Sequence, residues 1–419
     1  MVRATLKKYK SLSLFTFSSF FLNLSNLASG LVTFHWIDPY HIGLWQGLML
    51  IDTYSAFFRL GIINGMNREL PFAMGQGNMT LAVKYAETTL FFTVGNILVF
   101  IMFSMVAIFF IPWTTALLFP VAAIFIVVSV NFYNSYLYGT FRANADFDQL
   151  SIIQIIQGFL KIFSIALVVY LGFNGFLIRE ISIVLIITLF AHIKRPLKQV
   201  IPKFEKKIFL ELLKVGLPIF AGSYMLLFLN TVPRLLLLRF GTVAMLGIYA
   251  PLVTIIMAIS ALPDSITTFL YPRMTYQIGK TKDIKAVWKK TLFSHAGLFF
   301  LGIPIVIICY FGVPLVIDHF MPKYAESKSI IKLGVFTALF MSYKFGYTTL
   351  ITVKAWKQVI IYIGCFAALQ LTIPLILMRF YPILVAVTIG QMGSAFFMVI
   401  VSLSTNYSAT HKKDIKLLC

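Results

Sequence analysis

Long apolar runs recur along the whole of this chain, and they constrain its fold more than any other feature. Each run is about 20 residues long, the length that a helix needs to cross a hydrocarbon layer about 30 Å thick. Of the 419 residues, 59% are hydrophobic and only 12% are Asp, Glu, Lys or Arg, too few charges for an ordinary water-soluble surface. The runs also lack the alternation of polar and apolar residues that a transmembrane β-barrel needs. We therefore predict an all-α integral membrane protein.

The runs predict about twelve transmembrane helices, six on either side of a Lys-rich connector at residues 194–214. We expect two six-helix lobes, residues 1–203 and 204–419, around a central cavity. The predicted spans are residues 11–35, 43–64, 87–111, 114–138, 151–172, 174–193, 215–238, 246–270, 291–316, 330–353, 358–378 and 382–404.

The two halves share a plan, which indicates an internal repeat. A shift of 204 residues places Gly43 on Gly247 and Gly75 on Gly279, with a basic entry, a polar first span and a glycine-led second span in each half. Each half has an even number of spans, so the repeats have the same orientation and an axis along the membrane normal relates them.

Basic residues fall mainly on one side of the predicted membrane. Of the 35 Lys and Arg residues, 25 lie on the side of the N-terminus and five on the opposite side. Because cytoplasmic loops carry the excess of Lys and Arg, we predict that both termini are cytoplasmic. Cys309, Cys365 and Cys419 are isolated from one another and from any histidine cluster, so we expect neither a disulfide framework nor a metal site.

Polar side chains that fall inside the predicted spans are the candidate functional residues. A charged side chain in the hydrocarbon core costs a few kcal/mol, so it usually faces a bundle interior or a water-filled cavity. Helical spacing places many of them in stripes on five spans. The alternative is that they join helices together, with Asp52 and Arg59 as a buried structural pair. The stripes are Ser19, Asn23, Asn26 and Gly30; Asp52 and Arg59; Gln154, Gln157 and Lys161; Ser223, Asn230 and Arg234; and Thr337, Lys344 and Thr348.

The sign of the charge within the spans indicates an anionic ligand. Basic residues there outnumber the acidic ones, and Arg suits bidentate contacts with phosphate. We expect Arg59, Arg234, Lys161 and Lys344 to bind the anion. We expect Asn23, Asn26, Gln154, Gln157 and Asn230 to form the polar lining, and Asp52 is the acid that we nominate for coupling to an ion.

Four short motifs resemble bacterial polysaccharide-biosynthesis flippases of the Wzx type, which belong to the MOP superfamily. The segment from Arg59 to Pro71, which continues to Gly75-Gln-Gly, resembles their second span and the loop after it. The segment from Tyr138 to Phe147 resembles the loop after their fourth span. Phe320-Met-Pro-Lys-Tyr-Ala and Leu246-Gly-Ile-Tyr resemble the starts of their tenth and eighth spans. The resemblance covers nearly the whole chain in layout.

The resemblance implies two six-helix lobes, a location in the bacterial inner membrane and alternating access. It also implies a substrate that is an undecaprenyl-diphosphate-linked glycan, as for O-antigen or capsule. It implies no enzymatic activity and no cofactor, and its possible partners are a polysaccharide polymerase and a chain-length regulator. Asn230 stands where relatives can have an acid, which argues against proton coupling there. Two alternatives stay open: a drug antiporter on the same fold, and a membrane glycan polymerase or glycosyltransferase.

Overall fold

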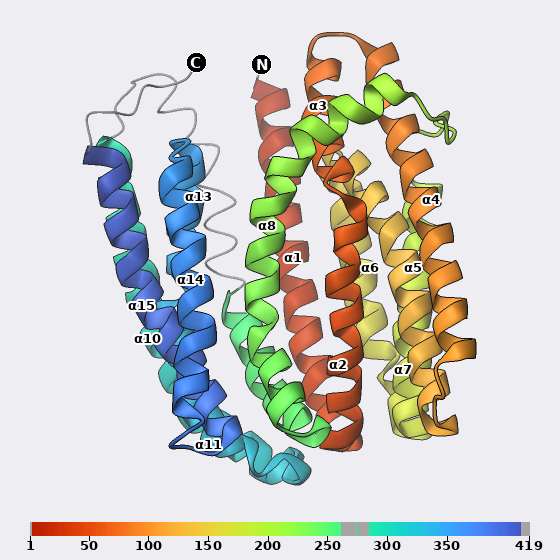
Figure 1. Cartoon of the computed structure of the whole chain (residues 1–419). Helices are drawn as coiled ribbons and strands as arrows, with labels where there is room; N and C mark the ends of the chain where they lie inside the picture. The colour runs from red at the N-terminus through yellow and green to blue at the C-terminus, as the bar shows by residue number, and fades with distance from the viewer. Residues whose placement is uncertain (1, 261–273, 275–284, 412–419) are drawn as a thin grey trace. The chain divides into compact units, whose positions relative to one another are not determined.

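The structure is a computed structural model that describes residues 2–260, 274 and 285–411, with side chains described at 13–260, 274 and 287–411. In this part of the chain α-helices are joined by short connections (Figure 1). Hydrocarbon offers no partner for backbone N–H and C=O groups, and a helix satisfies them within its own segment. The predicted all-α class is confirmed.

The first half of the chain holds α1 (Val2–Trp36), α2 (Pro39–Ser55), the short 3₁₀ helix η1 (Ala56–Arg59), α3 (Ile62–Gly75), α4 (Met79–Phe110), α5 (Thr115–Ala143), α6 (Phe147–Phe163) and α7 (Ile165–Ile193). The second half holds α8 (Lys206–Phe240), a helix at Val243–Ser260, α10 (Lys285–Phe320), η2 (Pro322–Tyr324), α11 (Ser327–Gly334), α12 (Thr337–Phe340), α13 (Tyr343–Thr352), α14 (Trp356–Leu377) and α15 (Ile383–His411).

The order of these helices agrees with twelve spans. Among the described residues, eight helices are long and apolar enough to cross a membrane by themselves. The other four predicted spans correspond to α1, to the broken series α2, η1 and α3, to α6 with the first turns of α7, and to the short helices α11 to α13. Several helices extend beyond the predicted ends, as α4 does at Met79, because a helix continues past the hydrocarbon into the interface. Residues 261–270 of the predicted eighth span lie outside the described residues.

The boundary between the fifth and sixth spans lies at Gly172, where the sequence places it. The backbone of Gly172 is not helical, with φ of 58° and ψ of −133°, so α7 consists of two helices that meet at this glycine. Glycine adopts a positive φ without the steric cost that a Cβ imposes. The chain reverses at this point, so that Gly175 packs closely against the backbone of Leu167. The two spans therefore form a tight helical hairpin.

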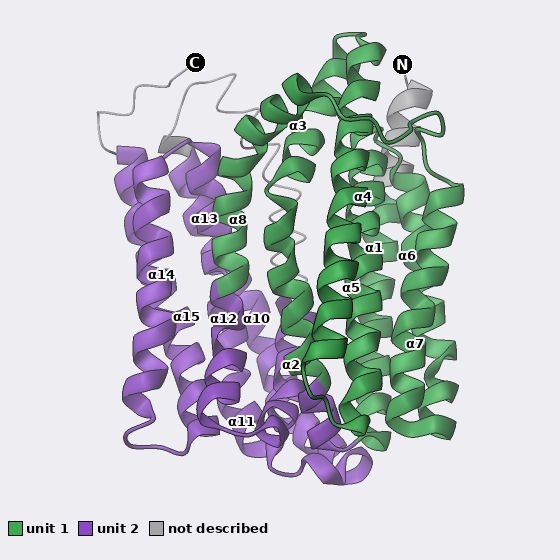
Figure 2. Cartoon of the chain, turned by 45° about the vertical axis from the view of Figure 1, so that its right-hand side comes forward, with its two compact units in different colours: residues 1–37, 45–228 green, residues 38–44, 229–419 purple. Residues whose placement is uncertain are grey.

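The chain divides into two compact units (Figure 2). Unit 1 contains Met1–Ile37 and Trp45–Phe228, and unit 2 contains Asp38–Leu44 and Leu229–Cys419. The first turn of α2 thus belongs to unit 2, where Gly43 packs against the backbone of Val243 and Gly247 against that of Pro39. The predicted lobe boundary at 203/204 stays a prediction.

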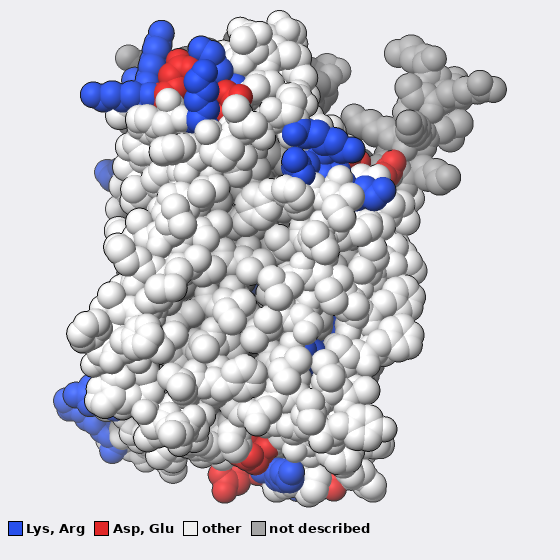
Figure 3. All heavy atoms as spheres, turned by 90° about the vertical axis from the view of Figure 1, so that its right-hand side faces the viewer, with Lys and Arg blue, Asp and Glu red and all other residues white. Residues whose placement is uncertain are grey.

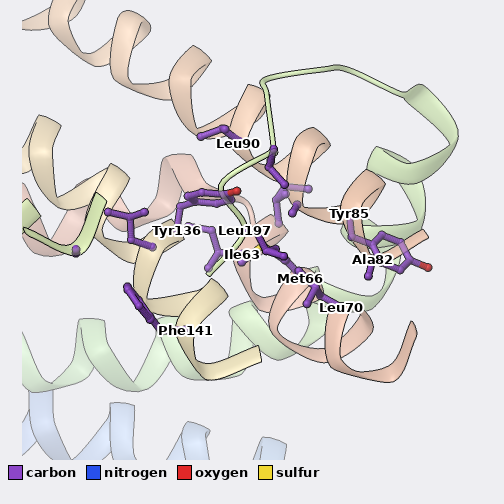
Figure 4. Close-up of a cluster of buried hydrophobic side chains, with 14 of the residues drawn as sticks. Ile63, Met66, Leu70, Ala82, Tyr85, Leu90, Tyr136, Phe141 and Leu197 are labelled. Atoms are coloured by element: carbon purple, nitrogen blue, oxygen red, sulfur yellow. The ribbon is translucent and has the colours of Figure 1, made fainter. Parts of the chain in front are cut away.

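The core of unit 1 joins α3, α4, α5 and the connector that precedes α8 (Figure 4). Ile63, Met66 and Leu70 of α3 are buried against α4 and α5, and Leu197 of the connector is buried with them. This packing fixes α3, the second part of a broken span, in one position relative to its neighbours.

The middle of one face of the molecule is almost free of charge, whereas Lys, Arg, Asp and Glu gather at its two ends (Figure 3). Large apolar side chains lie exposed on the long helices; among those on α4, Phe109 is 82% and Phe110 is 81% exposed. Such a surface suits lipid rather than water.

Candidate functional site

Unit 1 contains a cavity of about 430 Å³ between α2, η1, α5, α6 and α7. Its size falls in the range of small-ligand sites, roughly 300 to 1,000 Å³. Both charged and neutral polar side chains line it, which is unusual for a space inside a membrane-spanning bundle. The lining residues are Trp45, Met49, Asp52, Arg59, Val127, Asn131, Asn134, Ser135, Tyr138, Gln157, Lys161, Glu180, Ile183, Val184 and Ile187.

A break in the second span places Arg59 in this cavity. After η1 ends at Arg59, Leu60 and Gly61 have left-handed φ values of 45° and 79°. A left-handed conformation costs a residue such as Leu roughly 1–2 kcal/mol, so the surrounding packing must hold the break in place. The amide of Asn96 supports it by donating a hydrogen bond of 3.0 Å to the carbonyl of Phe58.

The guanidinium of Arg59 lacks a complete set of partners. Its Nε is buried and has no hydrogen-bond partner among the described residues. Its central carbon lies 5.3 Å from the ring centroid of Phe132, a cation–π contact that stabilises the charge without using any of its hydrogen bonds. Arg59 is therefore the lining cation with capacity left for an anion.

Asp52 faces the same cavity, but its described hydrogen bond is to an amide. Asn131 Nδ2 donates to Asp52 Oδ1 at 3.0 Å. In the described part of the chain, no ion pair joins Asp52 to Arg59. Asp52 and Arg59 therefore face the same cavity without a direct ion pair between them.

Lys161 is already paired. Its Nζ donates to both carboxylate oxygens of Glu180, each at 2.9 Å. The two residues come from opposite arms of the hairpin that turns at Gly172, and both side chains are largely buried. Burying a charge costs free energy because the charge loses its hydration. The attraction within a bidentate pair of this kind offsets part of that cost.

Arg179 lies behind this pair and is only 2% exposed. It donates to Ser164 Oγ at 3.1 Å, to Thr33 Oγ1 at 3.3 Å, to the carbonyl of Lys161 at 3.1 Å and to Ser29 Oγ. Its Nη1 is 3.8 Å from the carboxylate of Glu180. Arg179 thus fastens α7 to α1 and α6, and its hydrogen bonds hold it in place beside Glu180.

The arrangement can bind an ion in two ways. The lining has two basic residues, Arg59 and Lys161, and two acidic ones, Asp52 and Glu180. Because Glu180 already holds Lys161, the cavity offers Arg59 to an anion and Asp52 to a cation or a proton. No group of His, Cys, Asp and Glu side chains that could hold a metal ion occurs in the described ranges.

No family model matches the sequence, and no curated protein is detectably similar to it. Solved structures, in contrast, match nearly the whole chain. A multidrug resistance MATE family transporter of the MOP superfamily in its inward-facing conformation has a TM-score of 0.71 at 15% identity, and the match covers 92% of this chain and 94% of that chain. The chain has the MATE transporter fold. The outward-facing conformation of such a transporter gives a TM-score of 0.65 at 14% identity, with 96% of both chains covered. A mutant of the Vibrio cholerae MATE transporter VcmN gives 0.64 at 15% identity, with 96% of both chains covered.

Within this MATE fold, the residues that the sequence nominated belong to both units. Asp52, Arg59, Gln157 and Lys161 lie together in the cavity of unit 1, and Gln154, close by in α6, accepts hydrogen bonds from Ser18 and Ser19. Asn23 and Asn26 are exposed on α1. Asn230, Arg234 and Lys344 belong to unit 2, where Asn230 is exposed and the other two are half-buried. Arg59 and Lys161 are the two nominated anion ligands that share one site.

Sequence reasoning missed the contribution of α5. Asn131, Asn134, Ser135 and Tyr138 line the cavity and follow one another at helical spacing of three, four and seven residues from the first. That stripe was visible in the sequence. Sequence reasoning also missed Glu180 as the partner of Lys161. A hairpin that turns near residue 172 places these two residues opposite one another on its two arms.

Proposed function

We propose that this chain moves a lipid-linked, anionic glycan across the membrane by alternating access. Under this proposal the substrate is an undecaprenyl-diphosphate-linked repeat unit, carried from the cytoplasmic to the periplasmic leaflet for a surface polysaccharide such as O-antigen or capsule. The protein would lie in a bacterial inner membrane with both termini in the cytoplasm.

The observation that carries the proposal is the state of Arg59. It is a cation within a span, it lines a cavity, and its Nε has no hydrogen-bond partner in the described part of the chain. Arg binds phosphate through two parallel N–H···O bonds, and a diphosphate would supply the acceptors that the protein does not.

The rest of the lining suits a sugar. Asn131, Asn134, Ser135, Tyr138 and Gln157 supply hydroxyl and amide groups that can donate to and accept from glycan hydroxyls. The polyprenyl tail would stay in lipid, since transferring its long apolar chain into a polar cavity would be unfavourable. Arg234 and Lys344 of unit 2 stay proposed anion ligands, and a polysaccharide polymerase and a chain-length regulator stay proposed partners.

The fold supports the transport step. Solved structures of this fold include inward-facing and outward-facing conformations of a multidrug resistance transporter, which favours alternating access for this chain and disfavours a polymerase. A transporter must bind its substrate more weakly in the releasing state, because equal affinity in both states shifts no equilibrium. We expect no nucleotide to be used directly.

A second candidate is a small-molecule or drug antiporter. Two carboxylates, Asp52 and Glu180, line the cavity, and the similar structures are described as multidrug resistance transporters. An antiporter of cationic drugs needs an acid that exchanges its cation for a coupling ion, and Asp52 has no basic partner among the described ion pairs.

The test is complementation in a bacterium that lacks its own repeat-unit flippase and carries the native glycan pathway of this protein. The wild-type chain is compared with Arg59→Ala and with Arg239→Ala, an exposed arginine at the end of α8 that takes no part in the cavity. Surface glycan is scored at matched membrane abundance.

Restored surface glycan that is lost in Arg59→Ala and kept in Arg239→Ala supports the flippase. Persistent failure of the wild-type chain overturns it. Drug efflux that disappears in Asp52→Asn but not in Arg59→Ala would favour the antiporter instead.

A further inference from the structure

The Lys-rich connector between α7 and α8 presents a basic surface that the proposed transport mechanism does not use. Between residues 194 and 214 the sequence has seven Lys and Arg residues and only two acidic ones. The first part, residues 194–205, is not helical and leads into α8 beside α4 (Figure 1). Both α7 and α8 are long and apolar enough to cross a membrane, so the segment that joins them lies at the membrane surface.

Buried side chains fix residues 194–205 to unit 1. Leu197 and Val200 are 6% and 7% exposed and belong to the core that contains α3 and α4, where Figure 4 shows Leu197. Arg195 Nη1 donates to the ring Nε2 of His192 at 2.7 Å and to the carbonyl of His192 at 2.9 Å. The segment is therefore held in one position, and the side chains that point away from unit 1 form a defined surface.

Five exposed lysines make up this basic surface: Lys194, Lys198, Lys203, Lys206 and Lys207. Within the described part of the chain, no ion pair or hydrogen bond includes the amino group of any of them. The two acidic residues of the connector are engaged with α4. Glu205 pairs with Lys84 at 3.0 Å, and Glu211 accepts a hydrogen bond from the hydroxyl of Tyr85. The positive charge of the surface is thus left for a partner outside the chain.

Large apolar side chains are exposed between the lysines. Ile201 is 63% and Phe204 is 49% exposed. The ring of Phe204 lies 5.5 Å from that of Phe91 on α4, which is 45% exposed, so Phe204 continues the apolar surface of α4. A soluble polyanion would leave these side chains in water. A lipid leaflet accepts them at the boundary of its acyl chains while its phosphates meet the lysines.

We propose that this basic surface binds the headgroups of anionic phospholipids in the leaflet on its own side of the membrane. Each lysine near an anionic leaflet strengthens binding by about fivefold, so several lysines on one fixed segment select anionic lipid over zwitterionic lipid. Ile201 and Phe204 enter the same leaflet between them. The lipid site is separate from the cavity of unit 1 and does not depend on which substrate the protein carries.

The test is photo-crosslinking of the full chain in lipid nanodiscs of phosphatidylcholine that contain a small fraction of phosphatidylglycerol with a photoreactive headgroup. Mass spectrometry of the peptides locates the label. We expect residues 193–207 to carry most of it. Lys198→Gln with Lys203→Gln should lower the labelling of this segment about tenfold, since two lysines are removed. Lys198→Arg with Lys203→Arg should keep it, because the charge is unchanged.

Lys289→Gln with Lys357→Gln is the matched control. These two lysines are exposed on α10 and α14, and the sequence predicts that they lie on the same side of the membrane as the connector. The control therefore removes the same charge from the same side of the protein. It should leave the labelling of residues 193–207 unchanged.

Three results would overturn the proposal: label spread along the chain without preference for residues 193–207, undiminished labelling in Lys198→Gln with Lys203→Gln, or an equal loss in the control. Unlabelled phosphatidylglycerol should compete with the label, and additional phosphatidylcholine should not. Inorganic phosphate that competes as well as phosphatidylglycerol would also overturn the proposal, because that result would make the surface a site for soluble anions.

Discussion

The cavity of unit 1 and a polar cluster of unit 2 both bury polar side chains, but in opposite ways. The cluster of unit 2 consists of Thr291 and His295 of α10, Thr349 of α13, and Ser402 and Asn406 of α15. In unit 1 four charged side chains stand among the neutral ones, they surround a space, and Arg59 keeps unused hydrogen-bonding capacity. In unit 2 they are neutral, closely packed and connected by hydroxyl and amide bonds. The difference teaches that this protein buries charge in two settings, beside a cavity and, at Arg179, within a set of hydrogen bonds that joins helices, whereas the cluster of unit 2 joins its helices with neutral polar groups.

The largest effect is expected from breaking the ion pair beside the cavity. Glu180→Ala leaves Lys161 without its acid and Arg179 without a neighbouring counter-charge. Removing one partner of a buried pair costs about 3–5 kcal/mol. We expect a large loss of thermal stability in detergent, whereas the double variant Lys161→Met, Glu180→Met should recover most of it.

Removing a hydrogen-bonded pair of neutral side chains in unit 2 should cause a much smaller loss of stability. Thr291→Val with Thr349→Val removes both partners of a neutral hydrogen bond and keeps the shape, which is nearly neutral in many proteins. A loss of stability as large as that of Glu180→Ala would contradict the distinction between a charged site and a neutral cluster.

The next effect concerns transport rather than stability. Arg59→Lys keeps the positive charge but loses the planar fork that binds two phosphate oxygens. Hydrogen bonds to charged groups contribute about 1.5–3 kcal/mol, so the initial rate of substrate flipping at limiting substrate should fall about tenfold or more. Full activity of Arg59→Lys would indicate that Arg59 acts only through its positive charge and does not bind the substrate through two parallel hydrogen bonds.

Packing around Gly346 predicts an effect of intermediate size. A Cβ at this position would overlap Ser402 Oγ, so Gly346→Ala should destabilise the protein by about 1–3 kcal/mol. Ser402→Gly in the same chain should restore stability by making room. Gly364→Ala, on α14 where a Cβ meets no other atom within 4 Å, is the control and should be tolerated.

The smallest effect is expected at the connection between α1 and α2. Partial burial raises the pKa of Asp38, but hydrogen bonds from the ring and the backbone of His41 outweigh it and hold that pKa below its ordinary value. A carboxyl with a lowered pKa stabilises the fold above its ordinary pKa, and this contribution is lost as the pH falls through the lowered value. Because both side chains are more than 40% exposed, the pair contributes about 0.2–1 kcal/mol.

Unfolding of Asp38→Asn should therefore be slightly easier than that of the wild type at pH 7, and the two should converge as the pH falls through the lowered pKa of Asp38. A difference that grows on acidification would have the wrong sign for this interpretation. Chemical denaturation across the pH range measures it.

The spans were predictable because hydrocarbon thickness imposes one length on every helix, and the turn at Gly172 was predictable because the apolar runs meet there. The breaks at Leu60 and within α11 to α13 were not, since an apolar run gives no sign of a local change of backbone angle. The lining role of Asn23 and Asn26 stays a prediction. Nothing in the sequence indicated that the smaller Ser25 and Ser29 are polar residues of the first span that are buried.

Contacts between side chains of different helices were harder to predict than the residues that share one face of a helix. A stripe shows which residues share a side of one helix, but it does not say which other helix will lie against it. Lys161 with Glu180 was accessible from the hairpin, whereas Arg179 with Ser29 and Thr33 joins residues about 150 positions apart and depends on tertiary packing. The same holds for His295 and Ser402, which no sequence spacing connects.

The hairpin at Gly172 also bears on how the protein enters the membrane during synthesis. On translocon insertion scales, each charged residue near the middle of a helix costs roughly 2.5–3.5 kcal/mol. Lys161 lies on one arm of the hairpin, and Arg179 and Glu180 lie on the other. Neither arm gains from its partner's charge if it leaves the translocon alone. The fifth and sixth spans are thus expected to enter the bilayer together, as a pair whose charges meet before either one is exposed to lipid.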